Sequence, residues 1–115
     1  MTGVHGMHEL AIAESVIEAV RDKTGERTVL TVRLEVGRLS GVLVDSLQFC
    51  FMLAAADTPL AGAELQIHQP AGVARCASCG AEFEVTDLIL LCECGSFDVE
   101  VLTGQQLLIN SVEVG

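Results

Sequence analysis

Residues 76–95 read CASCGAEFEVTDLILLCECG and hold four of the chain's five cysteines in two pairs, each followed by glycine. Such pairs are typical of zinc knuckles, because the glycine permits the tight turn that brings backbone N–H groups toward a thiolate. Four thiolates complete a tetrahedral shell around a metal ion and leave no position for water or substrate. The sequence therefore predicts a structural metal site with four ligands: Cys76, Cys79, Cys92 and Cys94.

The sequence leaves two alternatives open for these cysteines. Iron in a rubredoxin-like site uses the same four ligands as zinc, and four free or redox-active thiols would hold no metal. The two glycine-flanked pairs favour a metal, although the second pair has one spacer residue fewer than the first. A segment with few aliphatic residues also depends on metal to fold. We therefore predict an inserted zinc-ribbon or rubredoxin-like domain over residues 73–104.

Two amphipathic helices are predicted before this insertion. Apolar residues recur at spacings of three and four from Met7 onward, and Gly25 ends the pattern. A second helix is expected after Asp45 or Ser46, either of which can cap it. Cys50 lies alone on the apolar face of this helix and is expected to act as a small buried hydrophobic residue.

Strands are predicted where apolar and polar residues alternate. Residues 28–36 alternate over their whole length, so we expect a half-buried strand with Leu30 facing the core. Shorter strands are predicted over residues 63–68 and 107–114. The fold class is therefore α+β, a small three-stranded sheet with two helices plus the inserted ribbon. The expected organisation is a flexible leader and a domain interrupted by the ribbon: residues 1–6, residues 7–72 with 105–115, and residues 73–104.

The composition narrows the possible function classes. Six Lys and Arg against sixteen Asp and Glu give a formal net charge of −10, which argues against nucleic-acid binding because basic side chains neutralise phosphates. No apolar run approaches the ~20 residues of a membrane span. The N-terminus lacks the basic start and apolar stretch of a signal peptide, so we expect a cytoplasmic protein. No catalytic set of Ser, His and Asp or of Cys and His is apparent, so we expect no enzymatic activity.

Among the three histidines, His8 has the surroundings most suited to a metal. It is followed by Glu9, so an imidazole, a carboxylate and backbone nitrogens lie close together, a donor set that suits nickel or copper. A solvated or capping histidine is the alternative reading of this position. His5 lies in the leader and is either inert or an accessory ligand, whereas His68 ends a predicted strand and is expected to be a surface or structural residue.

Met7-His8-Glu9-Leu10, at the start of the first helix, resembles the N-terminus of the HypA/HybF family, the nickel metallochaperones of nickel–iron hydrogenase maturation. The similarity covers essentially residues 7–115. The combination of motifs is specific to the family, whereas any one motif would be weak evidence. The other matching segments are LEVGRLSGV at residues 34–42, SLQF at 46–49, both cysteine pairs, and LINSVEV at 108–114.

The resemblance implies a nickel carrier. It implies that Ni(II) is the cargo, that His8 is the essential nickel ligand and that Glu9 supports it. Asp45 is the nearest candidate for an acidic residue that approaches nickel in some relatives, although capping is its expected role. The four clustered cysteines would hold structural Zn(II). The implied partners are a HypB-like GTPase and the precursor of the hydrogenase large subunit, and a homodimer is compatible with the family; some members also serve urease.

Two departures from the family pattern leave alternatives open. Family members usually begin at the methionine of the Met-His-Glu motif, whose terminal amine and first amides help to bind nickel, whereas six residues precede Met7 here. Either this leader is a different start or added sequence, or His5 serves as a further ligand. The second cysteine pair is CxC, with Leu91 three positions before Cys94. The alternative function is a zinc-ribbon interaction module without a nickel role.

Overall fold

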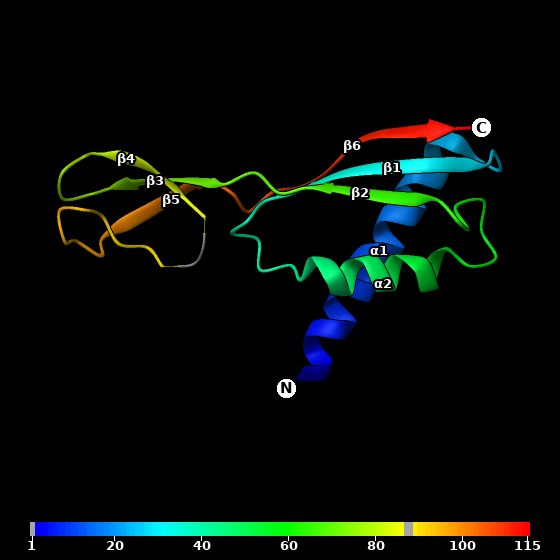
Figure 1. Cartoon of the computed structure of the whole chain (residues 1–115), viewed down its shortest axis with the longest axis horizontal. Coiled ribbons are helices and arrows are strands. Elements are labelled where there is room, and N and C mark those ends of the chain that lie inside the picture. The colour runs from blue at the N-terminus through cyan, green and yellow to red at the C-terminus, as the bar shows by residue number, and fades with distance from the viewer. Residues whose placement is uncertain (1, 87–88) are drawn as a thin grey trace. The chain divides into compact units, whose positions relative to one another are not determined.

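The computed structural model describes residues 2–86 and 89–115, with side chains from His8 onward (Figure 1). Within these residues the elements, in chain order, are α1 (Thr2–Thr24), β1 (Val29–Val36), α2 (Val44–Ala55), β2 (Glu64–His68), β3 (Gly72–Cys76), β4 (Glu82–Val85), β5 (Val99–Thr103) and β6 (Leu107–Val114). They form two compact units. We call them the helical unit (Met1–Leu34, Val42–Ile67 and Ile109–Gly115) and the ribbon unit (Glu35–Gly41 and His68–Leu108).

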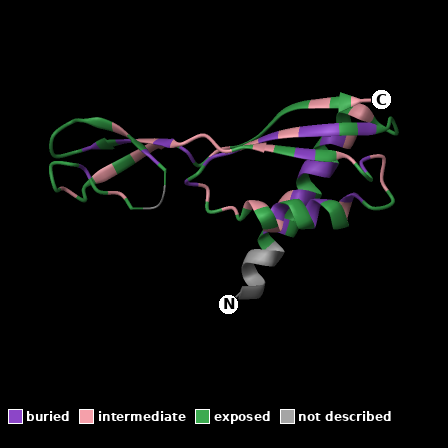
Figure 2. Ribbon diagram, viewed as in Figure 1, coloured by how far each residue is buried: buried purple, intermediate pink, exposed green. Residues whose placement is uncertain are grey.

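In the helical unit, α1 and α2 pack against each other and against a sheet of strand order β2-β1-β6 (Figure 1). The buried residues of each helix recur at the spacing of one helix face, as the bands in Figure 2 show for α2. They are Ala13, Val16, Ile17 and Val20 in α1, and Leu47, Cys50, Phe51 and Ala55 in α2. The predicted three-stranded sheet with two helices is confirmed, and so is the burial of Cys50.

Helix α1 begins earlier than predicted. It starts at Thr2 rather than at Met7, so residues 2–6 of the predicted leader have helical backbone, while Met1 lies outside the described residues. Nucleation is the costly step of helix formation, and each further residue then adds one backbone hydrogen bond. The segment contains no proline that would stop this extension.

Strand β1 departs from strict alternation near its start. Leu30 is 47% exposed, whereas its neighbours Val29 and Thr31 are buried, so the prediction that Leu30 faces the core is wrong. The first residue of the strand is bonded to the loop before β2, because the Val29 N–H donates to the Pro59 carbonyl at 3.0 Å. The buried positions shift by one residue before Val32 and then alternate as predicted.

Helix α2 begins without a side-chain cap. Its N-cap residue is Leu43, whose side chain makes no capping hydrogen bond. The prediction that Asp45 or Ser46 caps this helix is wrong, because both residues lie inside its first turn. The Asp45 carboxylate there still interacts favourably with the positive end of the helix dipole. The Leu43 N–H donates instead to the Glu9 carboxylate, at 3.2 Å.

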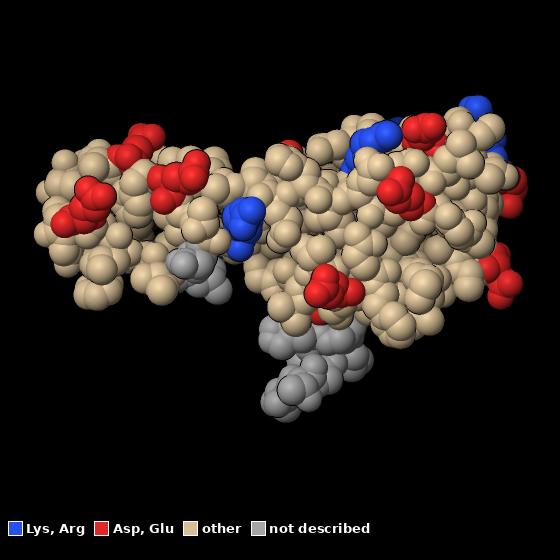
Figure 3. Space-filling view, in the orientation of Figure 1, with Lys and Arg blue, Asp and Glu red and all other residues tan. Residues whose placement is uncertain are grey.

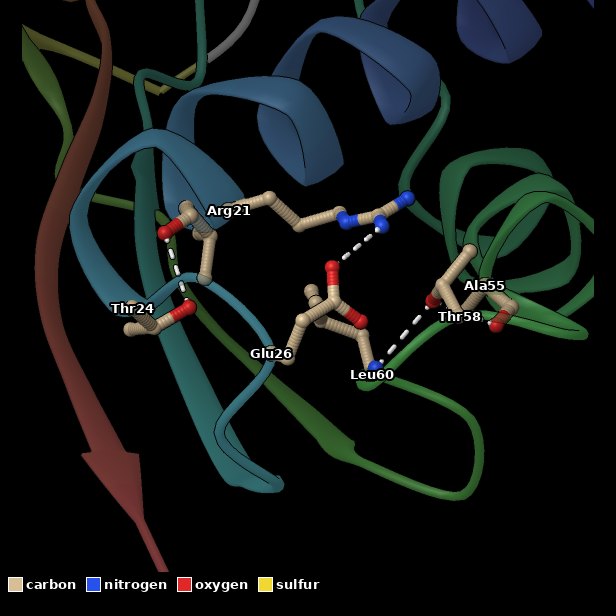
Figure 4. Close-up of polar contacts among 7 residues, drawn as sticks. Arg21, Thr24, Glu26, Ala55, Thr58 and Leu60 are labelled. Carbon is tan, nitrogen blue, oxygen red and sulfur yellow. Dashed lines mark hydrogen bonds and ion pairs between the residues drawn. The ribbon is translucent and has the colours of Figure 1, made fainter.

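Thr58 closes the turn that follows α2 (Figure 4). Its hydroxyl donates to the Ala55 carbonyl at 2.6 Å and accepts a hydrogen bond from the Leu60 N–H at 3.1 Å. The Leu60 side chain is fully buried. This side chain–backbone turn therefore fixes the direction in which the chain leaves α2 and enters the core.

Replacing Thr58 with valine is expected to lower the free energy of unfolding by about 1–2 kcal/mol, since the part-buried Leu60 N–H loses its partner and the Ala55 carbonyl keeps only the bond from the Thr58 N–H. Thr58→Ser keeps the hydroxyl and is expected to lose less than about half of that amount. Urea unfolding followed by circular dichroism measures both variants. A valine variant as stable as the parent would show that the hydroxyl does not hold this turn.

The face of the sheet opposite the helices is polar. Arg33 on β1 contacts the side chains of Gln66 on β2 at 3.1 Å and of Ser111 and Glu113 on β6 at 3.4 and 3.3 Å. These side chains are largely exposed, so each contact contributes little stability. Their effect is to connect all three strands on one face.

The ribbon unit is an antiparallel sheet of strand order β4-β3-β5. Its core consists of the buried residues Leu39, Ala74 and Val85, with a few partly buried apolar side chains packed against them. Arg75 on β3 lies opposite Glu82 on β4, and their side chains form an ion pair at 2.8 Å. Such a small apolar core needs a further source of stability.

Three glycines allow close backbone contacts at one end of the ribbon unit. The N–H of Gly37 donates to the Gln106 carbonyl at 2.9 Å, and the N–H of Leu39 donates to the Gly104 carbonyl at 2.7 Å. A methyl group on Gly37 would overlap this Gly104 carbonyl, and one on Gly104 would lie 2.6 Å from the Cα of Gly72. We call Gly37, Gly72 and Gly104 the glycine crossing.

Acidic side chains outnumber basic ones on the face drawn in Figure 3, in keeping with the net charge of −10. Neither of the helices in the described residues combines the length and apolar character that crossing a bilayer requires.

Candidate metal centre

The two cysteine pairs converge in the ribbon unit. Their four sulfur atoms all lie within 4.8 Å of one another, and the described residues contain no other group of three or more such ligand side chains. The Sγ atoms of Cys76 and Cys94 are 3.6 Å apart, as are those of Cys79 and Cys92. Metal–sulfur bonds of about 2.3 Å in a tetrahedron place sulfur atoms roughly 3.8 Å apart. The cluster therefore fits a tetrahedral thiolate metal site.

The two pairs form turns of different length. The N–H of Gly80 donates to the Cys76 carbonyl four residues earlier, whereas the N–H of Gly95 donates to the Cys92 carbonyl three residues earlier, both at 2.8 Å. Both glycines have positive φ, 78° and 94°, a conformation that glycine adopts without steric cost. The CxC pair thus compensates for its missing spacer residue with a tighter turn.

A pair of serines connects the two turns. The hydroxyls of Ser78 and Ser96 are 2.9 Å apart, and the N–H of Ala77 donates to the Asp98 carbonyl at 2.8 Å. Sequence reasoning missed this contact, although each pair has a serine beside a cysteine or glycine of the motif. These bonds join the two cysteine turns outside the group of four sulfur atoms, where outer-shell contacts of metal sites lie.

Hydrogen bonds and burial move the cysteine pKa values in opposite directions. The backbone N–H of Cys79 is the main cause that lowers the pKa of Cys76, to about 6. The N–H of Cys94 lowers the pKa of Cys92 as well, but burial and the hydrogen bonds that the Cys92 S–H donates to the neighbouring cysteine sulfurs together raise it to about 12. Four neighbouring thiolates repel one another, and a bound cation would supply the charge compensation that lets all four cysteines deprotonate.

The residues predicted to bind nickel lie in the helical unit and differ in exposure. His8 is exposed, whereas the next residue, Glu9, has an exposed fraction of 0%. Asp45 is exposed in the first turn of α2. The side chain of His5 lies outside the described residues. His68 is exposed at the end of β2, as predicted.

The contact of Glu9 with Leu43 was not predicted from the sequence. The available signal was the N-terminus of α2, where Leu43 occupies a position that usually holds Ser, Thr, Asp or Asn. A helix start without such a cap needs hydrogen-bond partners from elsewhere in the fold.

Fold and site together define a small α+β protein in which a four-cysteine ribbon precedes the last strand of a helical unit. The chain belongs to the HypA family, because the family described as "Hydrogenase/urease nickel incorporation, metallochaperone, hypA" matches residues 7–114. The predicted family is therefore confirmed. Because these proteins are metallochaperones, the prediction that the chain is not an enzyme is also confirmed.

Similar proteins cover nearly the whole chain. The "Hydrogenase maturation factor HypA" of Chlorobaculum tepidum is 47% identical over 112 residues, which span 94% of this chain and 99% of that protein. The protein of the same description from Geobacter metallireducens is 42% identical over 109 residues, with the same coverage of 94% and 99%.

Solved structures support the fold. The solution structure of the Ni metallochaperone HypA from Helicobacter pylori has a TM-score of 0.61 at 20% identity, over 92% of this chain and 96% of that one. Another solution structure, described as HypA protein, has a TM-score of 0.63 at 23% identity, over 94% and 96%. The predicted α+β fold with an inserted ribbon is confirmed.

Proposed function

We propose that this chain carries Ni(II) as cargo for the assembly of nickel–iron hydrogenase and holds the ion through His8. The observation that carries the proposal is an exposed histidine in Met7-His8-Glu9, the point at which the family match begins. Neutral imidazole is a good nickel ligand. An ion held at an exposed position can leave when a partner offers more ligands or when protons compete. The relatives described as hydrogenase maturation factors support hydrogenase as the recipient of the nickel.

Other donors complete the proposed nickel site. We assign accessory roles to His5 and Asp45, and a supporting role to Glu9 beside the ligand. Asp45 is exposed and therefore accessible to an ion, while imidazole and carboxylate together suit a borderline divalent cation.

His8→Ala is expected to abolish saturable nickel binding to zinc-loaded protein, because it removes the proposed essential ligand. Isothermal titration calorimetry with Ni(II) measures this on the full chain. The matched control is His68→Ala, which removes the exposed imidazole at the end of β2 and is expected to leave the nickel isotherm unchanged. If His8→Ala binds nickel as well as the parent, the N-terminal site is wrong and a ribbon interaction module becomes the better account.

We also propose that the resident metal of the cysteine cluster is Zn(II). The four ligands would be Cys76, Cys79, Cys92 and Cys94, and the sulfur spacing supports a closed tetrahedral shell. Zinc in such a shell stabilises the ribbon and takes no part in chemistry. Elemental analysis of the purified chain distinguishes zinc from iron, the alternative that uses the same ligands.

The proposal extends to partners and compartment. A HypB-like GTPase and the precursor of the hydrogenase large subunit, or a urease in some settings, would receive or exchange the nickel, and a homodimer is compatible with this role. The cytoplasm is the proposed site of action, because a reducing compartment keeps clustered thiols available for metal. Purified partners that co-elute with the parent chain in size-exclusion chromatography test these assignments.

A further inference from the structure

Glu9 is the only charged side chain that is buried in the part of the chain whose side chains are described. Its exposed fraction is 0%, although it directly follows the exposed His8. Removing a carboxylate from water is costly unless hydrogen bonds or positive charge replace the lost hydration. The surroundings of Glu9 must therefore supply such compensation.

That compensation comes from the start of α2. Glu9 Oε2 accepts a hydrogen bond from the N–H of Leu43, the N-cap residue, at 3.2 Å. In a capping box, a Glu or Gln three residues into the helix accepts this same bond. In α2 that position is Ser46, and Glu9 of α1 provides the acceptor instead. The positive end of the α2 dipole also favours a carboxylate there.

The second oxygen of Glu9 has the same buried setting. Its Oε1 is buried and has no hydrogen-bond partner among the described residues. Both oxygens are thus withdrawn from the solvent from which an ion would arrive. The one observed bond of the carboxylate is to the protein backbone.

We propose that Glu9 is a positioning residue that fastens α1 to the start of α2 and thereby fixes the turn carrying His8, and that its carboxylate does not ligate nickel. This inference rests on the proposed nickel site at His8. Because Glu9 adjoins the ligand in the chain, loosening its bond to Leu43 loosens the backbone of His8. Groups outside the ligand shell affect metal affinity in this way.

Two substitutions of Glu9 separate positioning from ligation. Glu9→Gln keeps an acceptor oxygen and the side-chain shape, whereas Glu9→Ala removes the acceptor. We expect the nickel Kd of the Gln variant to stay within about threefold of the parent, and that of the Ala variant to rise roughly 10- to 100-fold. X-ray absorption at the nickel edge is expected to show the same nearest neighbours in the parent and the Gln variant. Equal losses in both variants, with one oxygen neighbour missing, would overturn the proposal.

A third substitution removes the donor and leaves the N-terminal motif intact. Leu43→Pro deletes the Leu43 N–H, and the φ of −85° at this position lies close to the range of proline. We expect a folded Leu43→Pro variant to bind nickel as weakly as Glu9→Ala. Unchanged nickel affinity in that folded variant would overturn the proposal.

Amide hydrogen exchange of nickel-free protein tests the anchor independently of nickel. The Leu43 amide is expected to exchange faster in Glu9→Ala than in the parent, and the Gln variant to restore protection. Equal exchange in all three proteins would overturn the anchor. Nickel binding retained in His8→Ala would instead refute the proposed function, so the two failures are distinguishable.

Discussion

Cys76→Ser is expected to abolish stoichiometric metal binding and to unfold the ribbon unit while the helical unit stays folded. Cys76 is the last residue of β3, the central strand of the ribbon sheet, and it is 0% exposed. The apolar core of this unit is small, whereas structural zinc contributes roughly 10–16 kcal/mol in zinc-finger peptides. Elemental analysis gives the metal content, and ¹H–¹⁵N correlation spectra report the loss of dispersed signals from residues 68–108.

Cys50→Ala is the matched control, because Cys50 is a buried cysteine of the helical unit outside the cluster. It is expected to keep about one metal ion per chain and a folded ribbon. A chelator added to the parent should reproduce the spectrum of Cys76→Ser. A serine variant that keeps both its metal and its ribbon signals would refute a four-thiolate site that holds this unit together.

Gly104→Ala is expected to lower the free energy of unfolding of the metal-loaded ribbon unit by about 3–5 kcal/mol, as the sum of backbone strain and overlap. The φ of Gly104 is +113°, which side-chain-bearing residues rarely adopt. The added methyl group would lie 2.6 Å from the Cα of Gly72 and 3.1 Å from the Leu39 side chain. Backbone atoms cannot move aside as a flexible side chain can. Chemical denaturation of zinc-loaded protein measures the loss.

Two further alanine variants separate the causes. Gly41 has a φ of +79° with nothing within 4 Å of an added methyl group, so Gly41→Ala should cost only about 1–2 kcal/mol of conformational strain. Gly37 does not have positive φ, but its methyl group would overlap the Gly104 carbonyl, so Gly37→Ala should cost about 1–3 kcal/mol or more from overlap. If Gly104→Ala is no worse than Gly41→Ala, the glycine crossing is not tightly packed.

Most elements and the grouping of four cysteines were predictable from local patterns. The predicted strand over residues 107–114 has the same bounds as β6. The predicted strand over residues 63–68 begins one residue before β2. The four cysteines were predicted as one site, and their sulfur atoms converge. Spacing within a short segment predicts these features because helix, strand and knuckle geometry repeat locally.

The predictions that are wrong concern positions where segments distant in the sequence meet. The start of α2 was assigned to a local cap at Asp45 or Ser46, whereas its N-cap residue Leu43 bonds to Glu9 of another helix. The alternation of apolar and polar residues predicts that Leu30 is buried. In the structure Val29 is buried instead, where its N–H bonds to the Pro59 carbonyl, and the alternation of buried residues shifts by one position. No periodicity within the chain encodes such partners.

The sequence alone thus determined the family, the fold class and the four cysteines whose sulfur atoms converge. Only the tertiary structure decided that Glu9 is buried beside an exposed His8, and that Gly37, Gly72 and Gly104 come together from three separate segments. The physical reason is that periodicity and motif spacing record neighbours along the chain. Burial of a carboxylate and close backbone approach depend on segments that meet only after the chain has folded.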